Sequence, residues 1–201
     1  MIKKMTMIVS LVFFTMVSFA GAATLTFDDL EQSGPGAVVF PDYTDQGFKL
    51  DTNQSFGSWC QGNINYNNSA SVFINYRNHI AKLSVIDGSL FTLESIDLDT
   101  IFTNNGSSSV EFKAYNVNGI EITTEGTEIF DGWNTYHFST DFEDVSYVEW
   151  AQEDGYHQFD NIKLYKTEQY SSAVPIPNTC LLLSCGLIGL IKYRTYKIKR
   201  T

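Results

Sequence analysis

The residues best suited to chemistry in this 201-residue chain are aromatic side chains in or beside polar stretches. Tyrosine and tryptophan rings can stack on sugar rings, and neighbouring asparagine and glutamine side chains can hydrogen-bond sugar hydroxyl groups. Each ring could instead be part of a core, as we expect for Trp150, which follows Val148 with the period of two typical of a strand. The candidate sugar-binding residues are Trp59, Tyr66, Tyr76, Trp133 and Tyr156.

Catalytic motifs are absent from the sequence. The histidines are too widely spaced for a zinc motif, and no Gly-x-Ser-x-Gly elbow is present. A glycosidase needs two carboxyl groups about 5–9 Å apart, and spacing alone cannot pick such a pair from 23 acidic residues. We therefore predict that the protein is not an enzyme, and a polysaccharide-active enzyme is kept as an alternative. The histidines are His79, His137 and His157, and the acids weighed as a glycosidase pair are Glu149, Glu153, Asp154 and Asp160.

The charge distribution argues against nucleic acid as a partner. All 23 acidic residues but only six of the 13 basic residues lie between the two terminal segments, which gives this part a formal charge of −17. Nucleic-acid binding needs clustered lysine and arginine. Many carboxylates are instead available to divalent cations. Cys60 is the one cysteine of this part, so no disulfide framework is expected.

The residues that position these groups are predicted to form strands. Aromatic and β-branched residues are frequent, turn residues punctuate the chain, and no long 3.6-period apolar stripe is present. The clearest element is the alternating segment 109–116, which Asn118-Gly119 turns into 120–123. Residues 51–71 are predicted to be a long polar loop. The other expected strands are 24–27, 37–40, 47–50, 71–76, 90–98, 133–138, 145–150 and 159–165.

These strands predict one all-β domain over 24–166, a jelly-roll type antiparallel β-sandwich. A signal peptide over 1–23 is predicted before it: Lys3 and Lys4 precede an apolar segment, and the small residues 20–23 form a cleavage site. Cleavage is expected after Ala22 or Ala23. A short polar linker, 167–173, follows the domain.

The C-terminal segment 174–201 is predicted to direct the protein to a membrane. Its apolar run, 179–191, is shorter than the roughly 20 residues of a comfortable span, so crossing needs tilt or snorkelling of the flanking basic side chains. We predict a transmembrane helix over about 178–194, with a basic cytoplasmic tail. The segment opens with the motif Val174, Pro175, Ile176 and Pro177.

This segment resembles the PEP-CTERM sorting signal of Gram-negative bacteria. Ile176 stands where the family's motif has Glu, and Cys185 replaces a small residue. The resemblance implies that an exosortase-type sorting enzyme processes the chain. It also implies a route from an inner-membrane anchor to the cell surface or an extracellular polysaccharide matrix.

A second, weaker pattern resembles the galactose-binding-like jelly rolls of carbohydrate-binding modules. In such modules a structural calcium links acids of the first and last strands. The resemblance therefore implies calcium ligands among Asp28, Asp29, Glu31 and Asp160. The alternative is that these acids are solvated turn and edge carboxylates. The segments that carry the pattern are 91–98, 110–119, Trp133, 148–150 and 159–164.

Together these features predict a secreted, non-catalytic β-sandwich of the extracellular polysaccharide or biofilm matrix, with sugar binding as one mode of association. A structural matrix or adhesion protein that binds no sugar is the rival interpretation.

Overall fold

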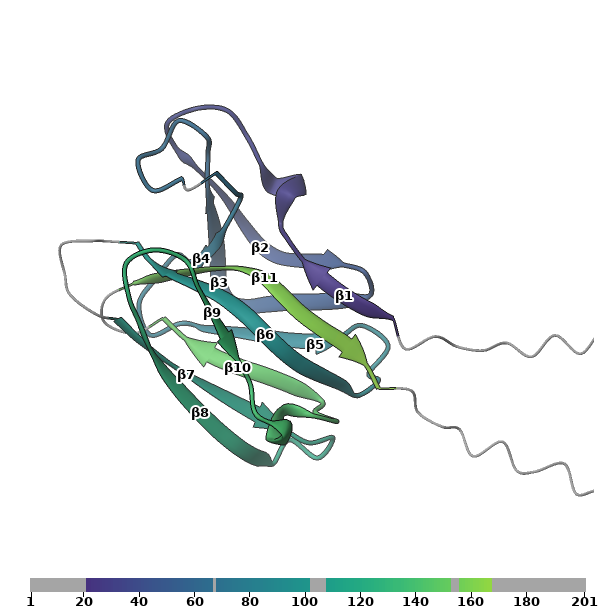
Figure 1. Cartoon of the computed structure of the whole chain (residues 1–201). Coiled ribbons are helices and arrows are strands. Elements are labelled where there is room, and N and C mark those ends of the chain that lie inside the picture. The colour runs from purple at the N-terminus through teal and green to yellow at the C-terminus, as the bar shows by residue number, and fades with distance from the viewer. Residues whose placement is uncertain (1–20, 67, 102–107, 153–155, 168–201) are drawn as a thin grey trace, which may run out of the picture. The chain divides into compact units, whose positions relative to one another are not determined.

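The computed structural model describes residues 21–66, 68–101, 108–152 and 156–167 (Figure 1). The chain divides into two units, Met1–Glu168 and Gln169–Thr201, and every described residue belongs to the first. Within these ranges no helix has the length and apolar character needed to cross a membrane. The predicted transmembrane helix, the sorting motif and nearly all of the predicted signal peptide lie outside the described residues.

The described part of the chain contains eleven strands and two short 3-10 helices, and every strand pairing is antiparallel. The predicted all-β antiparallel class is confirmed. The elements are β1 (Ala22–Leu25), η1 (Asp28–Leu30), β2 (Ala37–Asp45), β3 (Phe48–Trp59), β4 (Val72–Ile74), β5 (Ile80–Val85), β6 (Phe91–Thr100), β7 (Ser108–Tyr115), β8 (Glu121–Ile129), β9 (Asn134–His137), η2 (Thr140–Phe142), β10 (Tyr147–Ala151) and β11 (His157–Lys166).

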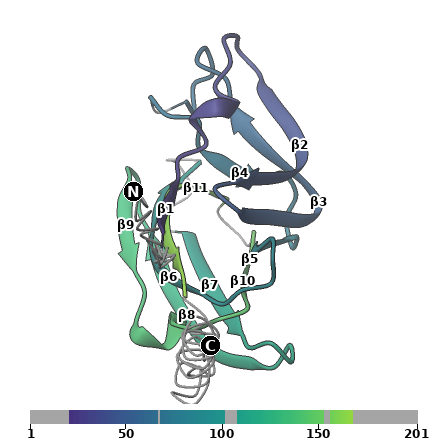
Figure 2. The same cartoon turned by 90° about the vertical axis from the view of Figure 1, so that its right-hand side faces the viewer.

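The long strand β3 joins two layers of sheet. Its first part pairs with β5 and its last part pairs with β4. Layer A therefore has the order β8-β7-β10-β5-β3, and layer B has the order β3-β4-β11-β6-β9. β2 follows β3 along its length, as Figure 2 shows, and β1 pairs with β11.

The predicted loop over 51–71 is wrong in its first part, because β3 continues to Trp59. Its asparagine, glutamine and serine residues suggested a loop, but pairing with β2 and β4 satisfies the backbone and holds them in a strand. The pairing of β2 with β3 has one irregularity, at Pro41, where the register between the two strands shifts. Proline has no N–H to donate to the ladder. The strand β5 was also missed: it lies in a segment where no strand was predicted.

The two layers pack through aromatic side chains. The rings of Trp150 on β10 and Phe159 on β11 lie 5.2 Å apart between centroids, and those of Phe48 on β3 and Phe91 on β6 lie 5.9 Å apart. The predicted burial of Trp150 is confirmed, with 2% of its surface exposed. These edge-to-face contacts join strands of layer A to strands of layer B.

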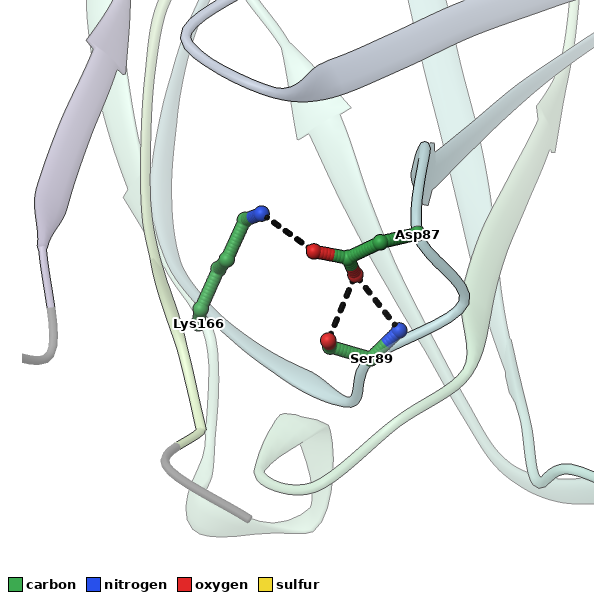
Figure 3. Close-up of polar contacts among 3 residues, drawn as sticks. All are labelled: Asp87, Ser89 and Lys166. Atoms are coloured by element: carbon green, nitrogen blue, oxygen red, sulfur yellow. Dashed lines mark hydrogen bonds and ion pairs between the residues drawn. The ribbon is translucent and has the colours of Figure 1, made fainter. Parts of the chain in front are cut away.

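The first and last strands are neighbours: Ala22 lies opposite Tyr165 and Leu25 opposite Ile162. A polar contact holds the end of β11 (Figure 3). The Lys166 ammonium donates to Asp87 at 2.9 Å, and Asp87 also accepts from the N–H and hydroxyl of Ser89. The bonds from Ser89 and Lys166 lower the pKa of Asp87. This contact ties the β5–β6 turn to the last strand.

Gly57 lies against the ring of Phe73, and a Cβ atom at this position would be 2.3 Å from Cζ of that ring. We expect Gly57→Ala to lower the free energy of unfolding by about 1–3 kcal/mol through overpacking. Gly126→Ala is the matched control, since its Cβ would meet only Val110 O at 3.5 Å. Urea denaturation measures both. Equal stability of the two variants would contradict the predicted packing.

Candidate functional site

The outer face of layer A carries a row of charged side chains, which we call the charge row: Asp51, Lys82, Glu149 and Lys113. The strand register places them directly opposite one another across β3, β5, β10 and β7, and Thr124 on β8 continues the row. They point outward because the residues that alternate with them, such as Leu83 and Val148, are fully buried. Acidic and basic groups therefore alternate across four neighbouring strands.

Each lysine on this face has a carboxylate partner. Lys82 Nζ lies 3.9 Å from Glu149, Lys113 Nζ lies 3.0 Å from Glu111, and a third lysine, Lys49, lies 2.6 Å from Asp51. The hydrogen bond to Glu111 raises the pKa of Lys113. Such exposed pairs add little to stability because solvent and salt screen them. Their main effect is to set out ammonium donors and carboxylate acceptors side by side.

Two tyrosines lie in the next row of the same face. Tyr147 on β10 is opposite Tyr115 on β7, and their rings stack with centroids 4.5 Å apart and planes at 13°. The Lys82 ammonium lies 3.6 Å from the centroid of the Tyr147 ring, a cation–π contact. Burial raises the pKa of both phenols. The tyrosine pair thus borders the charge row with an amphipathic surface.

Three adjoining hollows run across this face, and together we call them the groove. Their volumes are about 210, 180 and 330 Å³. The first and second share Ile80 and Glu149, and the second and third share Glu111, so the groove crosses from β3 to β8. The further lining residues are Asp51, Thr52, Asn53 and Lys82; then Lys113, Tyr115, Trp150 and Ala151; then Ser109, Val110, Gly126, Thr127 and Glu128.

The groove can hydrogen-bond a ligand that both donates and accepts. Ammonium groups only donate and ionised carboxylates only accept, so a hydroxyl group between Lys82 and Glu149 could use both of its roles. At one end, Asn53 Oδ1 accepts from the Ile80 N–H at 3.1 Å and lies 3.1 Å from the His79 ring, which fixes the amide. The arrangement suits a polyhydroxylated chain.

The five predicted aromatic residues lie elsewhere, and none lines the three hollows. Trp59 stacks on Phe73 at 4.4 Å, and its Nε1 is buried without a hydrogen-bond partner. Tyr66 donates its hydroxyl to Glu31. Tyr76 is 53% exposed and contacts His79 edge-on.

Of these five, Trp133 and Tyr156 lie near one end of β6. Trp133 is half-buried and follows Gly132, whose N–H donates to Asp99. The carbonyl of Tyr156 accepts from Ile101. A sugar-binding role for the five residues stays a prediction.

The predicted calcium ligands lie in different surroundings. Asp29 accepts from the Tyr43 hydroxyl at 2.8 Å, and Glu31 accepts from Tyr66. Asp160 is buried and accepts from Ser69 at 2.5 Å and from the Asn161 N–H at 2.7 Å. Among the described residues no three His, Cys, Asp or Glu side chains gather to hold a metal ion. The four acids therefore do not form one complete ligand set, and calcium stays a prediction.

Burial raises the pKa of Asp160 to about 6, and the nearby charges of Asp28 and Asp97 add to this shift. Two acids from the ends of the domain thus interact, because β1 leads into Asp28 and β11 contains Asp160. The ionised form of Asp160 is therefore disfavoured in the folded protein.

Comparison with known proteins shows similarity of fold. The sequence matches no family profile and no curated protein. A DUF4465 family protein from Bacteroides caccae is 12% identical; the match covers 73% of this chain and 100% of that chain, with a TM-score of 0.50.

Two carbohydrate-binding modules also match. The family 29 module from Piromyces equi is 11% identical over 73% of this chain and 90% of that chain, with a TM-score of 0.42. The CBM22-1 xylan-binding domain of Xyn10C from Paenibacillus barcinonensis is 13% identical over 72% and 92%, with a TM-score of 0.40. At these identities the likeness concerns the fold alone.

With calcium removed by a chelator, we expect ionisation of Asp160 to lower the free energy of unfolding by about 2–3 kcal/mol between about pH 4 and pH 6. Its folded pKa of about 6 lies above the ordinary value of 3.8. Between these two pKa values the folded state keeps a proton that the unfolded chain has released. The contribution of Asp160 to the free energy of unfolding is therefore fully present below pH 3.8 and is lost as the pH rises through 6. Asp160→Asn should remove this dependence, and Asp141→Asn, an exposed control, should keep it.

Calcium would oppose this loss at neutral pH. If the ion binds at Asp160, calcium chloride raises the melting temperature at pH 7, and Asp160→Asn abolishes the response. Identical melting curves in calcium and in chelator would leave these acids as carboxylates without a metal.

Proposed function

We propose that the protein is an exported, jelly-roll type β-sandwich that binds carbohydrate chains in the groove of layer A without cleaving them. The proposal rests on one observation: the groove crosses five strands, and on four of them ammonium and carboxylate groups alternate in a row. Sugar hydroxyl groups match such a row because each can accept from a lysine and donate to an acid. Extracellular polysaccharide is the proposed partner.

The absence of catalysis is part of this proposal. A glycosidase uses one protonated and one ionised carboxyl group. Two glutamates line the middle hollow, Glu111 and Glu149, and each lies beside a lysine ammonium. A site built from ion pairs suits recognition better than proton transfer.

Binding should depend on Glu149, which lines two of the three hollows. We expect Glu149→Gln to weaken binding of the best neutral oligosaccharide on a glycan array about tenfold, a loss of about 1.4 kcal/mol. The matched control is Glu94→Gln, an exposed strand glutamate of layer B, which should bind as the wild type does. Titration calorimetry measures both variants.

Two results would count against this site. Equal loss in both variants would indicate a general effect of charge, and loss only on substitution of Trp59 or Trp133 would place sugar binding at the aromatic residues predicted from sequence. A structural matrix or adhesion role would be favoured if no glycan binds. Shortening of any bound chain in a depolymerisation assay would overturn the non-catalytic proposal.

We also propose that both terminal segments are removed during export, by signal peptidase and by an exosortase-type enzyme, after a stage of anchoring in the inner membrane. Removal of both segments would leave the sheet largely paired, since β1 begins at Ala22 and β11 ends at Lys166. Cleavage after Ala22 leaves the pairing of Thr24 with Lys163 and of Leu25 with Ile162 in place.

Mass spectrometry of the protein recovered from cells should therefore find a chain that starts at Ala23 or Thr24 and stops near Val174 to Pro177. The measurement uses surface-exposed material released without detergent. A surface-exposed chain intact to Thr201 would mean that the C-terminal segment is a simple anchor and not a processed signal.

A further inference from the structure

We infer that the groove selects linear chains without acidic groups and binds about four sugar units laid across the strands; this inference rests on the proposed function. It follows from the charges of the groove and from its extent. Neither depends on the aromatic residues considered above.

The groove offers no unpaired cation to an acidic sugar. Its charged lining consists of two lysines and four acids, a net charge of −2. Lys82 already lies beside Glu149 and the Tyr147 ring, and Lys113 is bonded to Glu111. A uronate carboxylate would have to displace one of these acids or lie beside it.

Like charges in contact repel, and the excess of acids around the site adds to the effect over distances of about 10 Å at ordinary salt. An uncharged sugar avoids this repulsion, because its hydroxyl groups can bridge an existing ion pair without breaking it. The paired state of the lysines is therefore the source of selectivity.

The extent of the groove sets the length of the ligand. Neighbouring strands lie about 4.8 Å apart, so the four intervals from β3 to β8 span about 19 Å. One sugar unit of an extended chain is close in length to one strand interval. Gly126 lines the groove on β8, where the lack of a side chain leaves room for the last sugar unit.

The test is titration calorimetry of the full exported protein with defined oligosaccharides of two to six units. The neutral probes are β-linked oligomers of glucose, mannose and xylose, and the acidic probes are oligomers of galacturonate and mannuronate. We expect affinity for the best neutral series to rise up to about four units and then level off. Acidic oligomers of equal length should bind at least tenfold more weakly.

A charge variant tests the cause of the selectivity. Glu111→Gln releases Lys113 from its partner, so the ratio of acidic to neutral affinity should rise about tenfold, and Glu94→Gln should leave that ratio unchanged. Gly126→Val should remove the gain in affinity from the third to the fourth unit. A thermal melt of each variant shows whether it is folded.

The outcomes separate the two proposals. Acidic oligomers that bind as tightly as neutral ones, or a ratio unmoved by Glu111→Gln, overturn the charge selection while carbohydrate binding stands. A disaccharide that binds as tightly as a hexasaccharide overturns the extended mode. Failure of every probe to bind overturns the proposed function and this inference with it.

Discussion

The double pairing of β3 is the constraint on which the rest of the structure depends. One continuous strand hydrogen-bonds to β5 in layer A and to β4 in layer B, so the two layers are parts of a single sheet. The strand must change direction between these pairings, at 53–55, where the side chains are exposed or half-buried and no core contact resists the bend. The layers can then close on each other, and contacts such as Trp150 with Phe159 fill the space between them.

The same core fixes the chemistry of the outer surface. Ala81, Leu83 and Val85 of β5 are buried, which sets the register of that strand against β3 and β10. A slip of one residue would turn this apolar set outward and the lysine inward. Lys82 therefore faces Glu149 because the apolar residues on either side of it are held in the core. The groove is therefore positioned by the packing of the core beneath it.

Local patterns in the sequence predicted much of the fold but little of the site. The alternation in 109–116 predicted β7 and its outward Glu111 and Lys113, because period two is a local property of a strand. Residues 53–55 were assigned to a loop, since their composition does not reveal the partners that hold them in β3. The order of the charge row follows from pairings between strands distant in the chain, which no local pattern contains. Trp59 was selected as a candidate sugar-binding residue by its residue type, but the exposure of its ring depends on Phe73, which stacks against it.

The position of β11 has a mechanical consequence for any force applied to the chain at Lys166. β11 lies between β6 on one side and β1 and β4 on the other, and its pairing with β6 extends from His157 to Lys166. A pull on the chain at Lys166 along the axis of β11 would load this strand lengthwise. The hydrogen bonds on both of its edges then resist together in shear instead of opening one after another. A strand paired on both edges would therefore resist such a force better than a strand at the edge of the sheet.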